Sequence, residues 1–229
     1  MQKISAISDR ALVRLIPDSA RQPPVLRGLV DNDREAAVLA DIEGDTNARL
    51  IAEQEGTGTL DRRELSFARR LPGLSLYGIS HINAAFTHTR SRGNRFNGED
   101  RGAWYCAWDS ITSLHEVGYH RTRELQFINQ LQDIAIYREL LADFIGDFPE
   151  LDHGGAELDP DPAVGYPAGQ AFATKLRRDG HRALIYPSVR CAGGRCLVAF
   201  DPSIVQNVRP GSAWRLTWQG TPEFLIEGC

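Results

Sequence analysis

Arg95, Tyr105, Glu116 and Ser188 are the side chains of this sequence whose types could together bind and transform a small ligand. Arg95 lies in a glycine-flanked turn, RGNRFNG, which exposes backbone N–H groups. A guanidinium in such a turn can approach a phosphate with two parallel hydrogen bonds. An ordinary surface arginine in a tight turn would give the same sequence, so the turn alone leaves both interpretations open.

Tyr105 belongs to an aromatic run, WYCAWD, at residues 104–109. In a strand, alternation places Tyr105 and Ala107 on one face and the other three members (Trp104, Cys106 and Trp108) on the opposite face. One face can therefore pack in a core while the Tyr105 ring stacks on a flat heterocycle. Core packing alone would also explain an aromatic run.

Glu116 lies about two turns into a helix that we predict to begin after Asp109, a residue type that caps helix N-termini. We expect Ile111, Leu114 and Val117 to face the core. A carboxylate at the margin of an apolar face is either paired with a partner or poised for chemistry. Ser188 follows the apolar LIYP at the end of a predicted strand, where ligand contacts are common.

The elements that must position these residues form a mixed α+β domain whose C-terminal half is rich in strands. We predict a strand over residues 11–17, and a helical block over residues 31–70 that has capping residues and glycine stops. Residues 130–149 favour a strand at first, although 138–146 could be helical. Residues 157–170 are typical of a loop, 168–179 form an amphipathic helix that ends at Gly180, and short strands follow from residue 182.

The overall composition narrows the class of protein. The formal net charge is −4, which gives no support for a direct nucleic-acid partner. The N-terminal residues lack the apolar core of a signal peptide, and no run approaches the roughly 18 apolar residues of a membrane helix. We therefore expect a cytoplasmic protein without a membrane partner, whose four cysteines stay reduced.

Several motifs suggest other sites but are weak. His115 and His120 lie five residues apart, which separates them by about 140° around a helix and disfavours a shared metal. Cys191 and Cys196 have no second pair of ligands nearby, so we expect no metal. The segment EQE, residues 53–55, resembles the E-x-E motif of arginine-directed ADP-ribosyltransferases but sits in a polar helix. No glycine-rich dinucleotide or P-loop motif is present.

The order of the four residues resembles the RES domain family, which is named for its Arg, Glu and Ser. The segment GNRFN is similar to that family's G-G-R-[WF]-N turn, and a tyrosine strand and a glutamate helix follow at matching distances, on Tyr105 and Glu116. IYPSVR resembles the later V-P-S segment, with Ser188 on its serine, and ALVRLIP resembles the opening strand, with Arg14 on its arginine. The sequence departs from the family at Asn94, where a glycine is usual, and at SLHE before the acid.

This resemblance implies a toxin of a bacterial type II toxin–antitoxin system, neutralised by an Xre-like antitoxin. It implies an ADP-ribosyltransferase-like fold with a central split β-sheet flanked by helices, as a single domain over residues 1–229. Residues 20–75 would be a helical insertion or N-terminal elaboration. The substrate would be NAD, with Glu116 as the catalytic carboxylate, Arg95 and Arg14 at the diphosphate, and Tyr105 and Ser188 at the ribose or nicotinamide.

Three alternatives stay open at this point. ADP-ribose from NAD could pass to a protein acceptor, to water or to phosphate, and the sequence does not distinguish these products. The chain could also be an inactive RES-like module that only binds a partner protein. A metallohydrolase that uses His115 and His120 is the third alternative.

Overall fold

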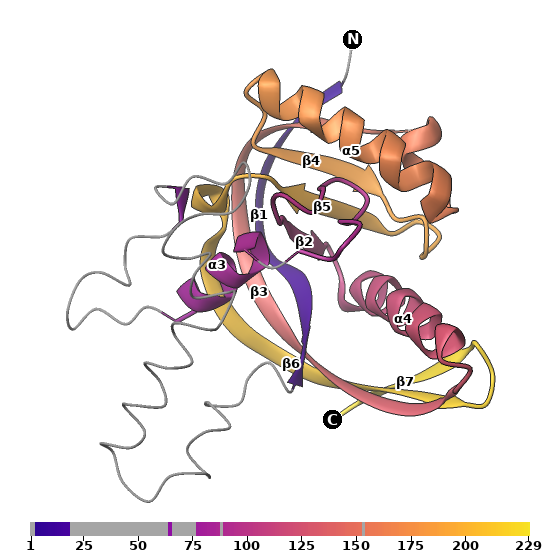
Figure 1. Cartoon of the computed structure of the whole chain (residues 1–229). Coiled ribbons are helices and arrows are strands. Elements are labelled where there is room, and N and C mark those ends of the chain that lie inside the picture. The colour runs from indigo at the N-terminus through magenta and orange to yellow at the C-terminus, as the bar shows by residue number, and fades with distance from the viewer. Residues whose placement is uncertain (1–2, 19–63, 66–76, 88, 153) are drawn as a thin grey trace, which may run out of the picture.

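The computed structural model describes residues 3–18, 64–65, 77–87, 89–152 and 154–229 (Figure 1). The helices are α3 (Ile79–Thr87), α4 (Ser110–Phe127) and α5 (Pro162–Arg178), with 3-10 turns at Ala156–Leu158 and Pro202–Ile204. The strands are β1 (Lys3–Pro17), β2 (Trp104–Ala107), β3 (Gln132–Glu150), β4 (Ala183–Pro187), β5 (Arg195–Ala199), β6 (Gln206–Gln219) and β7 (Phe224–Gly228). The α+β class is therefore confirmed. The helical block expected over residues 31–70 lies outside the described residues, apart from residues 64–65.

The seven strands form one mixed sheet that is divided into two groups. Strands β1, β3, β6 and β7 are antiparallel neighbours, and β2, β5 and β4 form a second, shorter antiparallel group. Among the described residues, the groups meet at two pairings, between Val13 and Ala107 and between Glu150 and Ile185, and the latter is parallel. This arrangement is the split sheet that was expected.

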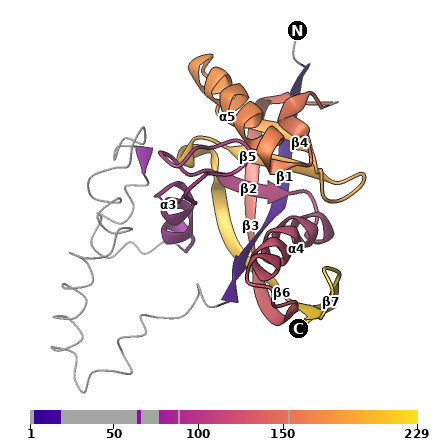
Figure 2. The same ribbon diagram turned by 45° about the vertical axis from the view of Figure 1, so that its right-hand side comes forward.

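Three hydrophobic clusters fix the layers. Helix α5 covers one face of the short group, where Ala173 and Leu176 pack with Leu184 and Val198 (Figure 2). The other face packs against the long strands and α3 in a cluster that includes Trp104, Phe86, Leu140, Phe144 and Leu197. None of the helices in the described ranges is long and apolar enough to span a membrane.

Helix α4 packs on the long strands and carries Glu116. Leu114 and Leu125 lie in a cluster with Val13, Leu216 and Trp218. Leu114 is fully buried as expected, and Val117 is partly buried against the same cluster. The expectation for Ile111 is wrong, because the residue is 47% exposed, whereas the nearby Ser110 and Ser113 are the side chains of this turn that contact strands β3 and β1.

Two other predictions differ from the structure. Residues 138–146 belong entirely to strand β3, because β1 and β6 pair along this segment and their hydrogen bonds override its helical propensity. Residues 162–170 are not loop but the first half of α5. Asp161 caps that helix through Ala163 N, and Pro162 occupies a first-turn position where no N–H is needed.

Asp109 caps α4 as predicted, and its removal should weaken the helix. Its carboxylate accepts hydrogen bonds from Thr112 N at 2.7 Å and from the Thr112 hydroxyl at 2.8 Å. We expect Asp109→Ala to lower the free energy of unfolding by about 1 kcal/mol in urea denaturation. Asp147→Ala, on an exposed position of β3, is the control and should change it little. Equal unfolding curves for the two variants would contradict the assigned cap.

Candidate active site

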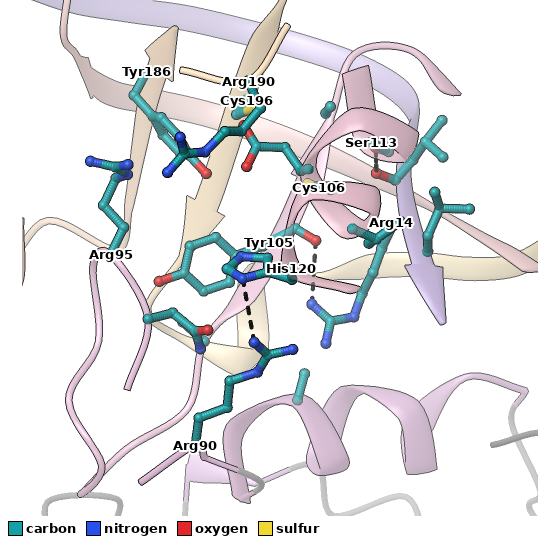
Figure 3. Close-up of a pocket in the computed structure, with 18 of the residues that line it drawn as sticks. Arg14, Arg90, Arg95, Tyr105, Cys106, Ser113, His120, Tyr186, Arg190 and Cys196 are labelled. Carbon is teal, nitrogen blue, oxygen red and sulfur yellow. Dashed lines mark hydrogen bonds between the residues drawn. The ribbon is translucent and has the colours of Figure 1, made fainter. Parts of the chain in front are cut away.

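A cavity of about 550 Å³ lies between β1, β2, α4, the segment between α3 and β2, and the β4–β5 connection, and it brings most of the predicted residues together. Arg14, Arg95, Tyr105 and Glu116 all line it. Figure 3 shows Arg14 and Arg95 on opposite sides of the Tyr105 ring. Ser188 reaches the same site through a hydrogen bond to Glu116. Residues that are far apart in the sequence therefore converge on one space.

Ser188, at the start of the β4–β5 connection, holds the Glu116 side chain in place. The Ser188 hydroxyl donates a hydrogen bond to Glu116 Oε1 at 2.6 Å, and its oxygen accepts from the backbone N–H groups of Arg190 and Cys191 at 3.1 and 3.0 Å. Since these N–H groups take the hydroxyl lone pairs, the hydroxyl proton is directed at the carboxylate. Burial raises the pKa of Glu116, while Ser188, Arg190 and Arg95 act in the opposite direction.

Ser188 should therefore control the ionisation of Glu116. We expect Ser188→Ala to raise the pKa of Glu116 further, because the hydrogen bond that favours the carboxylate is lost. Ser188→Thr keeps a hydroxyl and serves as the matched control. The carboxyl titration can be followed by ¹³C NMR. An unchanged Glu116 pKa in the alanine variant would show that Ser188 does not stabilise the charge.

Arg95 is an internal anchor rather than a surface side chain, since only 7% of the residue is exposed. Its Nη1 donates to the carbonyl oxygens of Glu157 and Asp159 at 2.9 and 2.8 Å, which ties the RGNRFNG turn to the segment before α5. A Cβ on Gly165 would lie 2.5 Å from this Nη1, and one on Gly169 would lie 2.3 Å from the Arg95 carbonyl oxygen. The two glycines thus allow α5 to approach, and the guanidinium still borders the cavity.

Tyr105 contributes a ring wall to the cavity, and its hydroxyl group holds the neighbouring turn. The hydroxyl accepts a hydrogen bond from Phe96 N at 3.0 Å and donates one to Asn97 Oδ1 at 2.8 Å. Burial raises the pKa of Tyr105. The phenol is therefore a neutral structural group, and only the ring is available to a ligand. The predicted alternation of the strand is confirmed, with Trp104 and Cys106 in the core on the opposite face.

Arg14 borders the cavity from β1. Its Nη1 donates to the Tyr105 carbonyl oxygen at 3.3 Å, and its guanidinium carbon lies 4.9 Å from the centre of the Trp104 ring. Burial lowers the pKa of Arg14 to about 10, so the side chain stays charged at neutral pH. A second positive group thus lies across the cavity from Arg95.

Sequence reasoning missed several cavity residues, among them Arg90, His120, Tyr166, Tyr186 and Arg190. The sequence suggested His120 only as a metal ligand. Because His120 lies four residues after Glu116 on the same helix, its position on the same face as Glu116 was predictable. Arg190 follows Ser188 by two residues, but its direction depends on the conformation of the β4–β5 connection. Its guanidinium lies 3.4 Å from the centre of the Tyr119 ring, and its Nη2 donates to the Pro160 carbonyl oxygen at 2.7 Å.

The two histidines considered as metal ligands have different surroundings. The His115 ring packs against Phe224, with ring centres 5.8 Å apart, and is not part of the cavity wall. His120 lines the cavity and is hydrogen-bonded to Arg90. Within the described ranges, no group of three His, Cys, Asp or Glu side chains has the arrangement of a metal site. His115 and His120 therefore do not face one common cavity.

A cavity on an α+β scaffold, with one partly buried carboxylate and several arginines in its wall, defines a class of site that can bind a small anionic ligand. The model of the RES domain matches residues 69–219, and the chain belongs to this family. The match includes Arg95, Tyr105, Glu116 and Ser188, whereas Arg14 precedes it. The family assignment made from the motifs is thus confirmed, and the role of Arg14 stays a prediction.

One solved structure that resembles the chain is the crystal structure of the M. tuberculosis MbcT–MbcA toxin–antitoxin complex. The sequence identity is 18% and the TM-score is 0.40, with 56% of this chain and 74% of the other chain covered. No curated protein sequence matches the chain.

Proposed function

We propose that this protein cleaves the bond between nicotinamide and ribose in NAD and acts as the toxin of a type II toxin–antitoxin system. The observation that supports this most is the position of Glu116, which is largely desolvated, aligned by Ser188 and placed in a cavity with Arg14 and Arg95. Membership of the RES domain family supports the same conclusion.

The reaction fits these groups. When the ribose–nitrogen bond breaks, its electron pair moves to the pyridinium ring, and neutral nicotinamide leaves. Positive charge then develops on the ribose C1 and ring oxygen, as in glycoside cleavage. A nearby carboxylate, already oriented and shielded from water, stabilises that charge in the transition state. Glu116 is the group proposed for this role.

The other residues have distinct proposed roles. Arg95, with Arg14, would bind the diphosphate, and the Tyr105 ring would pack against ribose or nicotinamide. Ser188 is better assigned to positioning Glu116 than to contacting NAD, because its hydroxyl already makes three hydrogen bonds. No metal takes part in this proposal.

The proposed setting is the bacterial cytoplasm, with NAD as substrate and an Xre-like antitoxin as the neutralising partner. ADP-ribose would pass to a protein acceptor, or to water or phosphate, without direct nucleic-acid binding. Residues 1–229 would act as one RES-type domain, with residues 20–75 as its elaboration.

The purified protein should release nicotinamide from NAD, measured by chromatography, and its expression without an antitoxin should stop bacterial growth. NAD labelled in the adenylate part, incubated with cell lysate, separates the three outcomes for ADP-ribose. A discrete labelled protein band indicates transfer to a protein, free ADP-ribose indicates hydrolysis, and ADP-ribose with an added phosphate indicates transfer to phosphate. Intact NAD together with normal growth would refute the proposal and favour the inactive binding module.

A further inference from the structure

His120 occupies a central place that the proposed reaction has not used. It lines the 550 Å³ cavity and also a neighbouring cavity of about 630 Å³. Five residues border both spaces: Leu15, Pro17, Arg90, Val117 and His120. Of these, only Arg90 and His120 have polar side chains. An elongated ligand that reached both cavities would pass these two side chains near its middle.

The hydrogen bond to Arg90 fixes the imidazole tautomer. Arg90 Nη1 lies 3.3 Å from His120 Nδ1, and Figure 3 shows this contact beside the Tyr105 ring. A guanidinium can only donate, so Nδ1 must be the acceptor and carry no proton. The ring proton is therefore on Nε2, and Nε2–H is a hydrogen-bond donor. Nε2 makes no hydrogen bond to any described residue.

Burial and the surrounding charges keep the His120 imidazole neutral. Burial, followed by the charges of Arg90, Arg190, Arg123 and Arg95, lowers the pKa of His120 to about 3. These arginines come from the loop after α3, the β4–β5 connection, α4 and the RGNRFNG turn. The acidic groups that line the two cavities are Glu116 on the same helix, Glu124, which pairs with Arg90 at 3.4 Å, and Asp18.

The same arrangement favours an anion beside His120. Two of the arginines, Arg190 and Arg123, stack on the Tyr119 ring, at 3.4 and 5.8 Å from its centre, and are thereby held near the imidazole. A cluster of cations around a neutral N–H donor is a suitable environment for phosphate oxygens. The centre of a dinucleotide is its diphosphate, which matches the position between the two cavities.

We propose that His120, held by Arg90 with its proton on Nε2, donates a hydrogen bond to a diphosphate oxygen of the dinucleotide. This inference rests on the proposed function for the identity of the ligand. It assigns His120 a binding role and Arg90 a positioning role. Proton transfer by His120 is not involved, because the ring stays neutral throughout the physiological pH range.

Two substitutions separate this role from a structural one. The side-chain amide of His120→Gln can place an N–H near the position of Nε2, whereas that of His120→Asn reaches only the position of Nδ1, beside Arg90. We expect His120→Asn to raise the Kd for ADP-ribose about tenfold or more, and His120→Gln to stay within about threefold of wild type. His181→Gln, outside both cavities, controls for the loss of a histidine and should bind as wild type does.

If His120→Asn bound ADP-ribose as wild type does and His120→Gln bound it weakly, His120 would only accept the hydrogen bond from Arg90. That result would overturn the proposal. Equal affinity of both variants and wild type would also overturn it. Inorganic pyrophosphate, used as a competitor, tests the part of the ligand involved. If pyrophosphate displaces ADP-ribose less effectively from His120→Asn than from wild type, a diphosphate contact is supported. If it displaces ADP-ribose equally well from both, the contact is contradicted.

NMR measures the tautomer without reference to any ligand. The ¹⁵N shifts of His120 should show a neutral ring with the proton on Nε2 from pH 5 to 8. In Arg90→Gln, the nearest cation is removed, and the pKa of His120 should rise. A charged ring or an Nδ1 proton in wild type would refute the inference even if NAD is cleaved. A wild-type protein that neither binds ADP-ribose nor releases nicotinamide would instead refute the proposed function, and the diphosphate contact with it.

Discussion

Replacing Glu116 by glutamine should reduce the rate of nicotinamide release by about 100- to 1000-fold, the range found when one well-placed electrostatic group is removed from an active site. Glutamine keeps the size of the side chain and can still accept the hydrogen bond from Ser188, which lies 2.6 Å from Oε1. Only the negative charge that would face the developing ribose cation is lost. Initial rates at saturating NAD measure this effect directly.

The same variant should be more stable than wild type at neutral pH. Because the pKa of Glu116 is raised in the folded protein, the folded state binds this proton more tightly than the unfolded chain does. The ionised carboxylate therefore costs stability progressively as pH rises above the usual glutamate value of about 4.3. The difference in Tm between Glu116→Gln and wild type should therefore shrink as pH falls towards that value, and should change little below it.

A matched control separates catalysis from folding. Glu227→Gln removes the same charge from an exposed position on β7, where the carboxylate lies 3.8 Å from Arg215 Nη1. It should leave both the rate and the pH dependence of Tm close to wild type. If Glu116→Gln released nicotinamide as fast as this control, another group would have to stabilise the ribose cation.

Replacing Arg95 by lysine should weaken NAD binding by at least about tenfold and should also destabilise the fold. One ammonium group cannot reproduce the paired bonds to the Glu157 and Asp159 carbonyls and at the same time present a planar fork to a diphosphate. Leaving a buried carbonyl without its donor costs about 1–3 kcal/mol. Calorimetry with ADP-ribose gives the affinity, and urea denaturation gives the free energy of unfolding.

Arg92→Lys is the control for this prediction, because Arg92 lies exposed in the same turn. Arg92→Lys should change neither the affinity for ADP-ribose nor the free energy of unfolding appreciably. A destabilised Arg95→Lys protein that still bound ADP-ribose normally would assign Arg95 to the structure alone. The diphosphate would then be held by other arginines on the cavity wall, such as Arg14 and Arg190.

The local part of the site was predictable from the sequence. The strand alternation around Tyr105, the Asp109 cap and the helical position of Glu116 depend on neighbouring residues, and all three are as expected. The interpretation of Arg95 as an anion ligand was incomplete. Its hydrogen-bond partners lie 62 and 64 residues further along the chain, and no local pattern indicates a carbonyl at that distance.

The non-local elements were harder to predict for the same reason. Residues 138–146 have helical propensity, and only pairing with β1 and β6 makes them a strand. Arg90 and Arg190 reach the cavity from irregular segments, whose backbone directions depend on tertiary contacts. The start of α5 was a missed local signal, since Asp161 and Pro162 form a recognisable helix N-terminus.

The division of the sheet has a mechanical consequence for ligand binding. Glu116 is carried by α4 on the long strands, whereas Arg95 is anchored to the segment before α5, which covers the short strands. Two strand pairings connect these groups of strands in the part of the chain that the structure describes. A molecule that contacts both side chains would therefore add a further link between the two groups of strands and should limit their relative motion.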